Sequence, residues 1–186
     1  MTPKTSNIFI NDVTLRDGEQ APGNTMTVSE CVEIAHLLAA TGINGIEAGF
    51  PAASEKDREA VSRIAVEIGK LALPSTSGII TYPRISGLAR LVREDIDHAL
   101  QCVQRAPHRG VHTLISTSQA QVCKFDERMK RLGLKPVNMK EFIDRIVLPD
   151  LQLIEEARKK DPGIIMQFSL EDFTRTDMEI AKTVIE

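Results

Sequence analysis

The stretch NDVTLRDGEQAPG, residues 11–23, follows directly on an apolar, β-favouring run that begins at residue 8. It gathers four charged or amide side chains within five positions: Arg16, Asp17, Glu19 and Gln20. Burying unpaired ions inside a strand is very costly, so these side chains are expected at a strand end. The stretch therefore predicts a first strand over residues 8–15 with an active-site mouth at its carboxyl end.

The composition is that of an ordinary globular protein. The 186 residues, 42% hydrophobic and 26% charged, suit one domain with a substantial core. The net charge of −3 and the lack of basic runs interleaved with aromatic residues argue against a nucleic-acid partner. No apolar stretch is long enough for a membrane span or a signal peptide, so no membrane partner is expected. Three widely spaced cysteines, Cys31, Cys102 and Cys123, favour reduced thiols in a cytosol-like compartment.

Strand and helix patterns alternate along the chain. Capping boxes at Thr27–Glu30 and Thr176–Glu179 predict helix starts, and Ser54 opens another helix. The predicted strands cover residues 8–15, 45–50, 84–89, 111–116 and 164–171. The predicted helices cover residues 28–41, 55–68, 94–105, about 139–160, and the segment after residue 176. Residues 70–82, with proline, glycine and several hydroxyl side chains, are predicted to form a loop.

Five alternations of strand and helix predict βαβ crossovers and a parallel sheet, either doubly wound or closed into a barrel. No GxGxxG follows the first strand, which disfavours the dinucleotide-binding form. Two-residue alternation places these side chains on one face of the late strands: His112, Leu114, Ser116, Gln167, Ser169 and Glu171. Polar groups at the carboxyl ends of the strands are typical of (β/α)₈ active sites, so we expect an α/β fold of the parallel TIM-barrel type.

Five motifs then stand in a fixed order along the chain: TLRDGEQAPG (14–23), GINGIEAGFPAAS (42–54), GLAR (87–90), VHTLISTS (111–118) and FSLEDFTRTD (168–177). They resemble the α-isopropylmalate synthase and homocitrate synthase group, metal-dependent TIM barrels related to the hydroxymethylglutaryl-CoA lyases. RDGEQ and GFPAAS favour the 2-isopropylmalate synthase branch, because the lyases typically carry RDGLQ. On this resemblance, residues 1–186 form the N-terminal part of a single (β/α)₈ catalytic barrel, about five of its eight βα units.

The resemblance implies a Claisen-type condensation of acetyl-CoA with a 2-keto acid, followed by thioester hydrolysis. In the favoured branch the keto acid is 2-oxoisovalerate and the pathway is leucine biosynthesis. Homocitrate and citramalate synthases are the alternatives within the family. A divalent metal (Mg²⁺, Mn²⁺ or Zn²⁺) is the implied cofactor, acetyl-CoA is the co-substrate, and the implied location is the cytoplasm or an organelle stroma or matrix after import.

The resemblance also assigns site residues. Asp17 would ligate the metal, and Arg16 would hydrogen-bond the keto oxygen as it becomes an alkoxide, roles that suit a hard oxygen ligand and a fixed cation. Glu171 is the second catalytic candidate. The candidates for substrate binding are Gln20, Glu47, Leu88, His112, Ser169 and Thr174. Glu47 has an equally weighted alternative, an ion pair with an arginine of a neighbouring strand at the barrel mouth.

The family's metal site takes two further ligands from an HxH motif on the sixth strand, and the 186 residues contain no HxH. Two hypotheses follow. The chain is an enzyme or enzyme portion that works as a homo-oligomer or by pairing with a C-terminal half, or it is a truncated, non-catalytic remnant that binds a partner chain. In both cases its first and fifth strands are expected to be open edges, which favours association.

Overall fold

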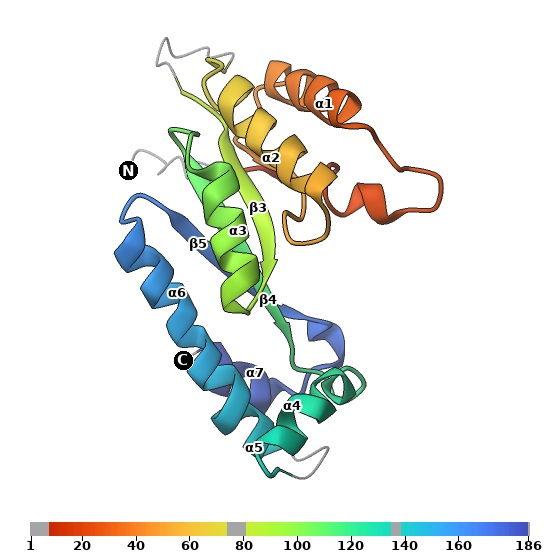
Figure 1. The fold of residues 1–186 in the computed structure, drawn as a ribbon, viewed down its shortest axis with the longest axis vertical. Helices are drawn as coiled ribbons and strands as arrows, with labels where there is room; N and C mark the ends of the chain where they lie inside the picture. Colours follow the sequence, from red (N-terminus) through yellow and green to blue (C-terminus); the bar gives the residue numbers. More distant parts are fainter. Residues whose placement is uncertain (1–7, 74–80, 135–138, 186) are drawn as a thin grey trace, which may run out of the picture.

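The computed structural model describes residues 8–73, 81–134 and 139–185, and its centre is a five-stranded sheet (Figure 1). The strands are β1 (Asn11–Asp12), β2 (Gly45–Glu47), β3 (Arg84–Arg90), β4 (Arg109–Ser116) and β5 (Ile165–Glu171). Every neighbouring pair is parallel, and the order in the sheet is the order in the sequence. This is the arrangement of consecutive βα units in a TIM barrel, so the predicted fold class is confirmed.

Helices make the connections between the strands. They are α1 (Val28–Ala40), α2 (Glu55–Glu67), α3 (Arg93–Val103), α4 (Asp126–Arg131), α5 (Met139–Phe142), α6 (Leu148–Lys160) and α7 (Met178–Ile185). Figure 1 shows α1, α2, α3 and α6 side by side along the sheet, while α4, α5 and α7 gather beyond the carboxyl end of β4. No helix in the described part of the chain is long and apolar enough to cross a bilayer.

The first strand is much shorter than predicted. β1 contains only two residues, and the apolar side chains before it are exposed, Ile8 at 80% and Phe9 at 51%. An apolar, β-favouring run becomes a buried strand only where a neighbouring strand and a packed layer cover it. Asn11 pairs with Gly45, the first residue of β2, so residues 8–10 lie before the start of that strand and the prediction of a strand from residue 8 is wrong. Residues 74–80 of the predicted loop lie outside the described residues.

Two helix starts follow the predicted capping. Thr27 Oγ1 accepts from the backbone N–H of Glu30 at 3.3 Å, and the Glu30 carboxylate accepts from the N–H of Thr27 at 2.7 Å. This reciprocal pair satisfies two of the N–H groups that a helix start leaves unpaired. The Ser54 hydroxyl likewise accepts from the N–H of Asp57 at 3.1 Å and caps α2.

The last helix is capped one residue later than predicted. Asp177 Oδ1 accepts from the N–H of Glu179 at 2.9 Å, whereas Thr176 Oγ1 lies 3.0 Å from Thr117 Oγ1 in a buried contact. Either side chain can cap a helix, and the buried hydroxyl partner decides between them. The capping box assigned to Thr176 and Glu179 is therefore wrong, although the helix it announced is present.

The long helix predicted over residues 139–160 is interrupted. α5 runs into a π-helical segment, Ile143–Val147, and then into α6, whose first turn contains Pro149. Proline has no N–H to donate to the preceding turn, so the hydrogen-bond ladder changes register before it. One continuous stretch of helical chain remains, as predicted, but it is not a single α-helix.

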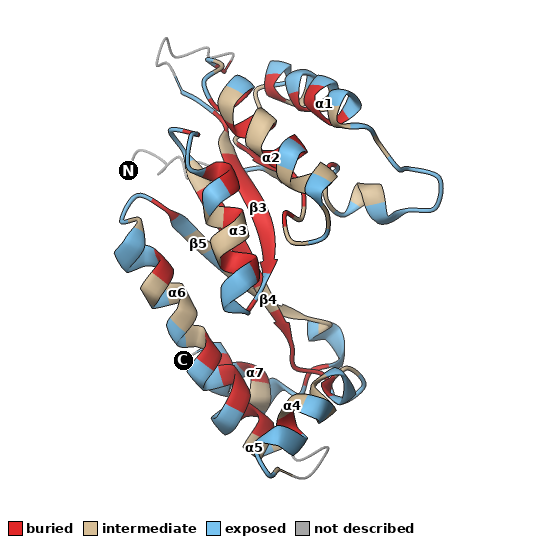
Figure 2. Ribbon diagram, in the orientation of Figure 1, coloured by how far each residue is buried: buried red, intermediate tan, exposed pale blue. Residues whose placement is uncertain are grey.

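An apolar layer between the sheet and the outer helices forms the core (Figure 2). The apolar residues of α2 and its C-cap that recur at helical spacing are at most 3% exposed: Ala60, Val61, Ile64, Ala65 and Ile68. Cys31 and Cys102 are buried in the same layer, and Cys123 is exposed. The helical period of apolar residues thus marks the side of the helix that faces the core.

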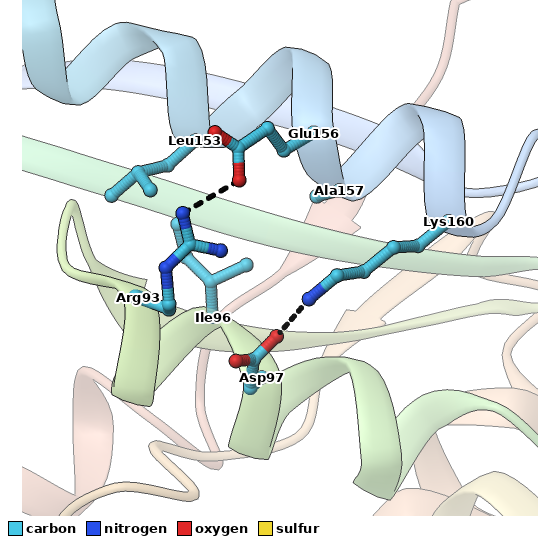
Figure 3. A pocket seen from close by; sticks show the side chains of 7 residues that line it. All are labelled: Arg93, Ile96, Asp97, Leu153, Glu156, Ala157 and Lys160. Carbon is cyan, nitrogen blue, oxygen red and sulfur yellow. Dashed lines mark hydrogen bonds and ion pairs between the residues drawn. The ribbon is translucent and has the colours of Figure 1, made fainter.

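The contact between α3 and α6 is closed by ion pairs at its rim (Figure 3). Arg93 bonds Glu156 at 2.6 Å, and Lys160 bonds Asp97 at 2.8 Å. The recess between them measures about 10 Å³, room for roughly one water molecule. It is a seam between two packed helices and is too small for a substrate.

Candidate active site

The face of the sheet that points away from the helices carries the polar residues. Gly87 marks the opposite face, since a Cβ there would lie 3.5 Å from the Cβ of Ala99 on α3. Because side chains alternate along a strand, Ser86 and Leu88 point to the polar side. The strand register then aligns the neighbouring residues of this face: Glu47 with Ser86, Leu88 with His112, His112 with Gln167, Leu114 with Ser169, and Ser116 with Glu171.

A continuous chain of hydrogen bonds crosses this face. Arg16 Nε donates to Glu47 Oε1, and Glu47 Oε2 lies 2.7 Å from His112 Nδ1. His112 Nε2 lies 2.8 Å from Ser169 Oγ. The side chains come from the turn after β1 and from β2, β4 and β5. We call these four residues, Arg16, Glu47, His112 and Ser169, the polar relay.

A tight turn after β1 sets the direction of Arg16. The Val13 carbonyl accepts from the N–H of Arg16 at 3.1 Å and from that of Asp17 at 2.8 Å. Asp17 stands at the head of a 3₁₀ turn, Gly18–Gln20, with its side chain 62% exposed. Its Oδ1 accepts from Arg16 Nη1 at 2.7 Å. The Arg16 guanidinium thus bonds two carboxylates: that of Glu47, which is buried, and that of Asp17, which is exposed to solvent.

Glu47 is the buried anion of the relay, with only 1% of its surface exposed. Burial by itself would raise the pKa of this carboxyl. The hydrogen bond and charge of His112, together with the charge and hydrogen bond of Arg16, outweigh burial and hold the pKa below its usual range. Glu47 is therefore ionised at neutral pH, and its two oxygens can only accept hydrogen bonds.

A second polar cluster lies at the carboxyl ends of β4 and β5. Ser116 Oγ donates to Glu171 Oε2, and Lys124 Nζ lies 3.6 Å from Glu171 Oε1. Beside it, Asp172 accepts from Ser118 Oγ and, at 2.8 Å, from Arg175 Nε. Both bonds lower the pKa of Asp172, and the hydrogen bond from Arg175 contributes more than that from Ser118.

Asp172 has a left-handed backbone conformation, with φ of 64°. Among residues with a side chain, aspartate and asparagine tolerate this region best. The reversal directs the chain out of β5 into the 3₁₀ turn Phe173–Arg175. It also turns the Asp172 side chain toward Ser118. Of the two neighbouring carboxylates, Glu171 is the one that accepts the hydrogen bond from Ser116.

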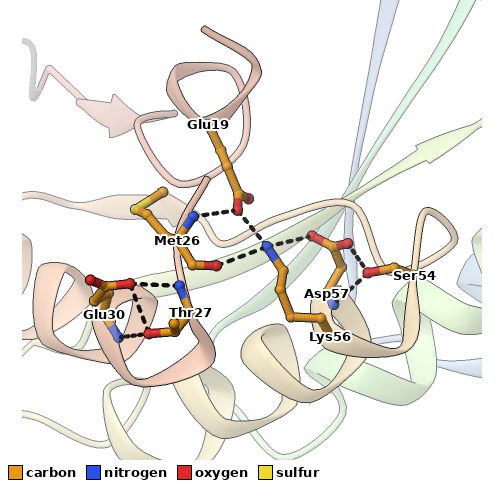
Figure 4. Close-up of polar contacts among 7 residues, drawn as sticks. All are labelled: Glu19, Met26, Thr27, Glu30, Ser54, Lys56 and Asp57. Carbon is orange, nitrogen blue, oxygen red and sulfur yellow. Dashed lines mark hydrogen bonds and ion pairs between the residues drawn. The ribbon is translucent and has the colours of Figure 1, made fainter. Parts of the chain in front are cut away.

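Glu19 holds the loop in place and, unlike its neighbours Arg16 and Asp17, is not part of the polar group at the site (Figure 4). Its carboxylate bonds Lys56 Nζ on α2, and Lys56 also donates to the Met26 carbonyl at 3.2 Å. Glu19 Oε1 further accepts from the N–H of Met26 at 3.3 Å. The loop that follows the Arg16–Asp17 turn is therefore tied to the start of α2. The RDGEQ motif combines a group facing the site with a structural anchor.

The predicted site residues fall into two sets. Arg16, Asp17, Glu47, His112 and Ser169 form one connected group, and Leu88 lies beside His112, 6% exposed. Gln20 and Thr174 are exposed and outside this group, and Glu171 belongs to the neighbouring cluster. The ion-pair alternative for Glu47 is observed.

Sequence reasoning missed Lys124 and Ser118. Ser118 lies two residues beyond Ser116, so extending the alternation of β4 would have pointed to it. Lys124 follows the strand in a separate turn, and only the fold places it near Glu171. For Asp172, the residue type is the one sequence feature that points to its position, because aspartate favours tight turns.

The described residues do not by themselves form a metal site. They contain no group of three or more histidine, cysteine, aspartate or glutamate side chains placed to hold an ion. Asp17 offers one exposed carboxylate, and one of its oxygens already bonds Arg16. Divalent ions in proteins take several ligands, so Asp17 alone is an incomplete set. Any metal held here needs ligands from outside the described part of the chain.

Comparisons with known proteins agree with this architecture. The chain is 37% identical to 2-isopropylmalate synthase of Pyrococcus abyssi (strain GE5 / Orsay) over 183 residues, 96% of this chain and 31% of that protein. It is 39% identical to 2-isopropylmalate synthase of Salinibacter ruber (strain M8), covering 98% of this chain and 30% of that protein. The enzyme of the same name from Caulobacter vibrioides (strain NA1000 / CB15N) is 36% identical with the same coverage. The chain thus spans about 30% of the length of these curated relatives. The sequence model of the HMGL-like family matches residues 7–186, and the chain belongs to that family.

Proposed function

We propose that this chain forms the keto-acid side of the active site of an enzyme that condenses acetyl-CoA with a 2-keto acid. The favoured keto acid is 2-oxoisovalerate, as in 2-isopropylmalate synthase, which is the name its relatives carry. The observation that carries the proposal is the polar relay, which fixes Arg16 at the carboxyl edge of a parallel sheet. In barrels of this type the chemistry takes place at that edge.

The hydrogen-bond inventory of Arg16 supports its role. A guanidinium has five N–H donors, of which Nε is used by Glu47 and one hydrogen of Nη1 by Asp17. Nη2 and the second hydrogen of Nη1 have no partner among the described residues, and they remain for a ligand. Because the cation is already held in place, it can stabilise negative charge that develops on a keto oxygen without first reorganising.

The rest of the face suits a small keto acid. Leu88 provides an apolar wall beside His112, and Ser169 offers a hydroxyl at the end of the relay. Glu171 is the proposed second catalytic residue, and Gln20 and Thr174 are proposed to contact the substrate at the rim. Asp17 is the metal ligand that this chain would contribute, the other ligands coming from outside the described residues. Acetyl-CoA is the proposed second substrate.

The sheet edges bear on how such a site is completed. β1 pairs only with β2, and β5 only with β4, among the described residues. We propose that these edges pair with the remaining strands of the barrel, supplied by a C-terminal portion of the protein or by another chain. A unit that binds a partner without catalysis is the second candidate, and the same open edges favour it.

The test is release of free CoA from acetyl-CoA that depends on added 2-oxoisovalerate, with and without the C-terminal portion supplied in trans. Because Cys123 is an exposed free cysteine, detection of CoA with a thiol reagent uses a Cys123→Ser background. Turnover only with the added portion, in the presence of Mg²⁺, Mn²⁺ or Zn²⁺, is the expected result. Pyruvate and 2-oxoglutarate in parallel reactions distinguish the citramalate and homocitrate synthase alternatives.

A matched pair of variants assigns any activity to the site. Arg16→Lys removes the planar guanidinium, and we expect kcat to fall by about 10²-fold. Arg63→Lys makes the same chemical change at a surface ion pair with Glu67 on α2 and should leave turnover unchanged. Absence of turnover under every condition, while the two portions demonstrably associate, would favour the non-catalytic binding unit instead.

A further inference from the structure

Glu47 serves two partners with separate oxygens. Oε1 accepts from Arg16 Nε, and Oε2 lies 2.7 Å from His112 Nδ1. The Glu47 side chain is 1% exposed, so water does not compete for either bond. Its position at the carboxyl end of β2 places it between the turn after β1 and the middle of β4. The carboxylate is thus positioned to orient two groups of the face and is itself shielded from solvent.

The bond to Glu47 fixes which nitrogen of His112 carries a constant proton. An ionised carboxylate has no hydrogen to give, so Nδ1 must donate. This holds for the neutral ring and for the charged ring alike, because only one nitrogen differs between them. Nε2 is therefore the atom that gains or loses a proton, and it lies 2.8 Å from Ser169 Oγ.

We propose that Glu47 is a positioning residue that makes Nε2 of His112 the proton-exchanging atom of this face and directs the exchange to the hydroxyl of Ser169. With a neutral ring, the Ser169 hydroxyl donates to Nε2 and presents only lone pairs to a ligand. With a charged ring, Nε2–H donates to Oγ, and the hydroxyl hydrogen is free to bond an anionic oxygen.

A proton can pass along this route with its balance kept. Nε2 gives its proton to Ser169 Oγ, and Oγ gives its own hydrogen to an oxygen of the ligand. His112 ends neutral, Ser169 is unchanged, and the ligand oxygen is protonated. An alkoxide oxygen on a bound keto-acid adduct is the acceptor that the proposed function would supply. The inference depends on that function for the identity of the ligand only.

Few other charges face His112. Its neighbours in register on β3 and β5 are Leu88 and Gln167, both uncharged. Arg84 lines a recess on the same face together with His112, and Arg16 lies beyond Glu47. Among the described residues, Arg84, Arg16 and Glu47 are thus the charged groups on this side of the ring. The anion is the group in direct contact with it, which is why Glu47 determines the protonation of Nδ1.

The test is a long-range ¹⁵N–¹H correlation spectrum of the histidine rings, recorded on the chain without substrate on the alkaline side of the histidine titration. His112 is identified by the signals that disappear in His112→Gln. We expect the wild-type ring to be in the Nδ1–H form. In Glu47→Gln the side-chain amide can both donate and accept, so we expect a mixture of the two tautomers.

Ser169→Ala is the matched control. It removes the partner of Nε2 but leaves Glu47 in place, so the Nδ1–H form should persist. An Nε2–H ring in the wild type, or an unchanged Nδ1–H ring in Glu47→Gln, would overturn the proposal. If Glu47→Gln does not fold, the wild-type and Ser169→Ala spectra decide. Since no substrate is present, a failed CoA-release assay leaves this result unaffected.

Discussion

β3 and β5 have the same length but opposite surroundings. β3 lies between β2 and β4, and its residues from Ile85 to Ala89 are all buried, whereas no residue of β5 is buried (Figure 2). On the side that faces the helices, Ile85 of β3 is fully buried, whereas Met166, Phe168 and Leu170 of β5 are only partly buried. Ile165 lies on the polar face of the edge strand and is 48% exposed, so burial here is set both by neighbours in the sheet and by the face that a side chain occupies. The polar relay crosses the sheet from the turn after β1 to the edge strand β5.

The largest effect should come from truncating the same residue type on the two strands. Ile85→Ala removes a fully buried side chain, and we expect the free energy of unfolding to fall by about 2–5 kcal/mol. Ile165→Ala should cost less than about 1 kcal/mol, because half of that side chain is already in water. Urea titration of both variants measures the difference. Equal losses would show that the edge is packed as tightly as the interior.

Within the polar relay, we expect the buried Glu47 to contribute to the free energy of unfolding. Glu47→Gln removes the anion that compensates Arg16, and we expect a loss of about 2–4 kcal/mol in the free energy of unfolding. Glu67→Gln, which breaks an exposed pair with Arg63 on α2, should cost only about 0.3–0.5 kcal/mol. Thermal or urea unfolding compares the two. A loss for Glu47→Gln as small as that of the surface variant would mean that the buried pair adds nothing to stability.

The stabilisation that Glu47 contributes should decrease as the pH falls. Its pKa is lowered in the folded protein, so its contribution is complete above the unfolded value of about 4.3. The contribution is lost as the pH falls through the folded pKa, where the carboxylate takes up a proton. The gap in unfolding free energy between wild type and Glu47→Gln should therefore be widest at neutral pH and close in acid. A gap that widens below pH about 4 would contradict this sign.

The smallest effect on stability should come from a charge on the edge strand. Ile165→Lys places a cation at an exposed position, and we expect the free energy of unfolding to change by no more than about 0.5 kcal/mol. Charged side chains on an edge oppose pairing with other chains. Analytical ultracentrifugation should thus show less self-association than in the wild type. Unchanged association would place the contact elsewhere than at β5.

Much of the fold could be predicted from local patterns. The apolar face of α2, the Thr27 capping box and the alternation on β4 are set by residues close in sequence, and the structure has them as expected. The predictions were wrong where contacts between residues far apart in the sequence determine the local structure. Residues 8–10 look like a strand but lack cover, and Thr176 bonds Thr117, the residue after β4, instead of capping the helix.

The candidate site could be predicted only in part, for the same reason. Alternation put His112 and Ser169 on polar faces, and the motif marked Arg16 and Asp17. The contact of Glu47 with His112 joins residues 65 positions apart across β3, and the strand register that creates it has no local signature. The ion pair of Glu47 with Arg16 is present, and a direct role of Glu47 at a substrate stays a prediction.

The tie between Glu19 and Lys56 has a consequence for ligand affinity. A loop that becomes ordered only when a ligand arrives subtracts its lost conformational entropy from the binding free energy, about 1–2 kcal/mol per residue of backbone. Here the segment after Arg16 and Asp17 is fastened to α2 by contacts within the chain itself. Its ordering is completed during folding. A ligand that meets Arg16 therefore finds a rigid partner, and the contacts it makes there count almost in full toward its affinity.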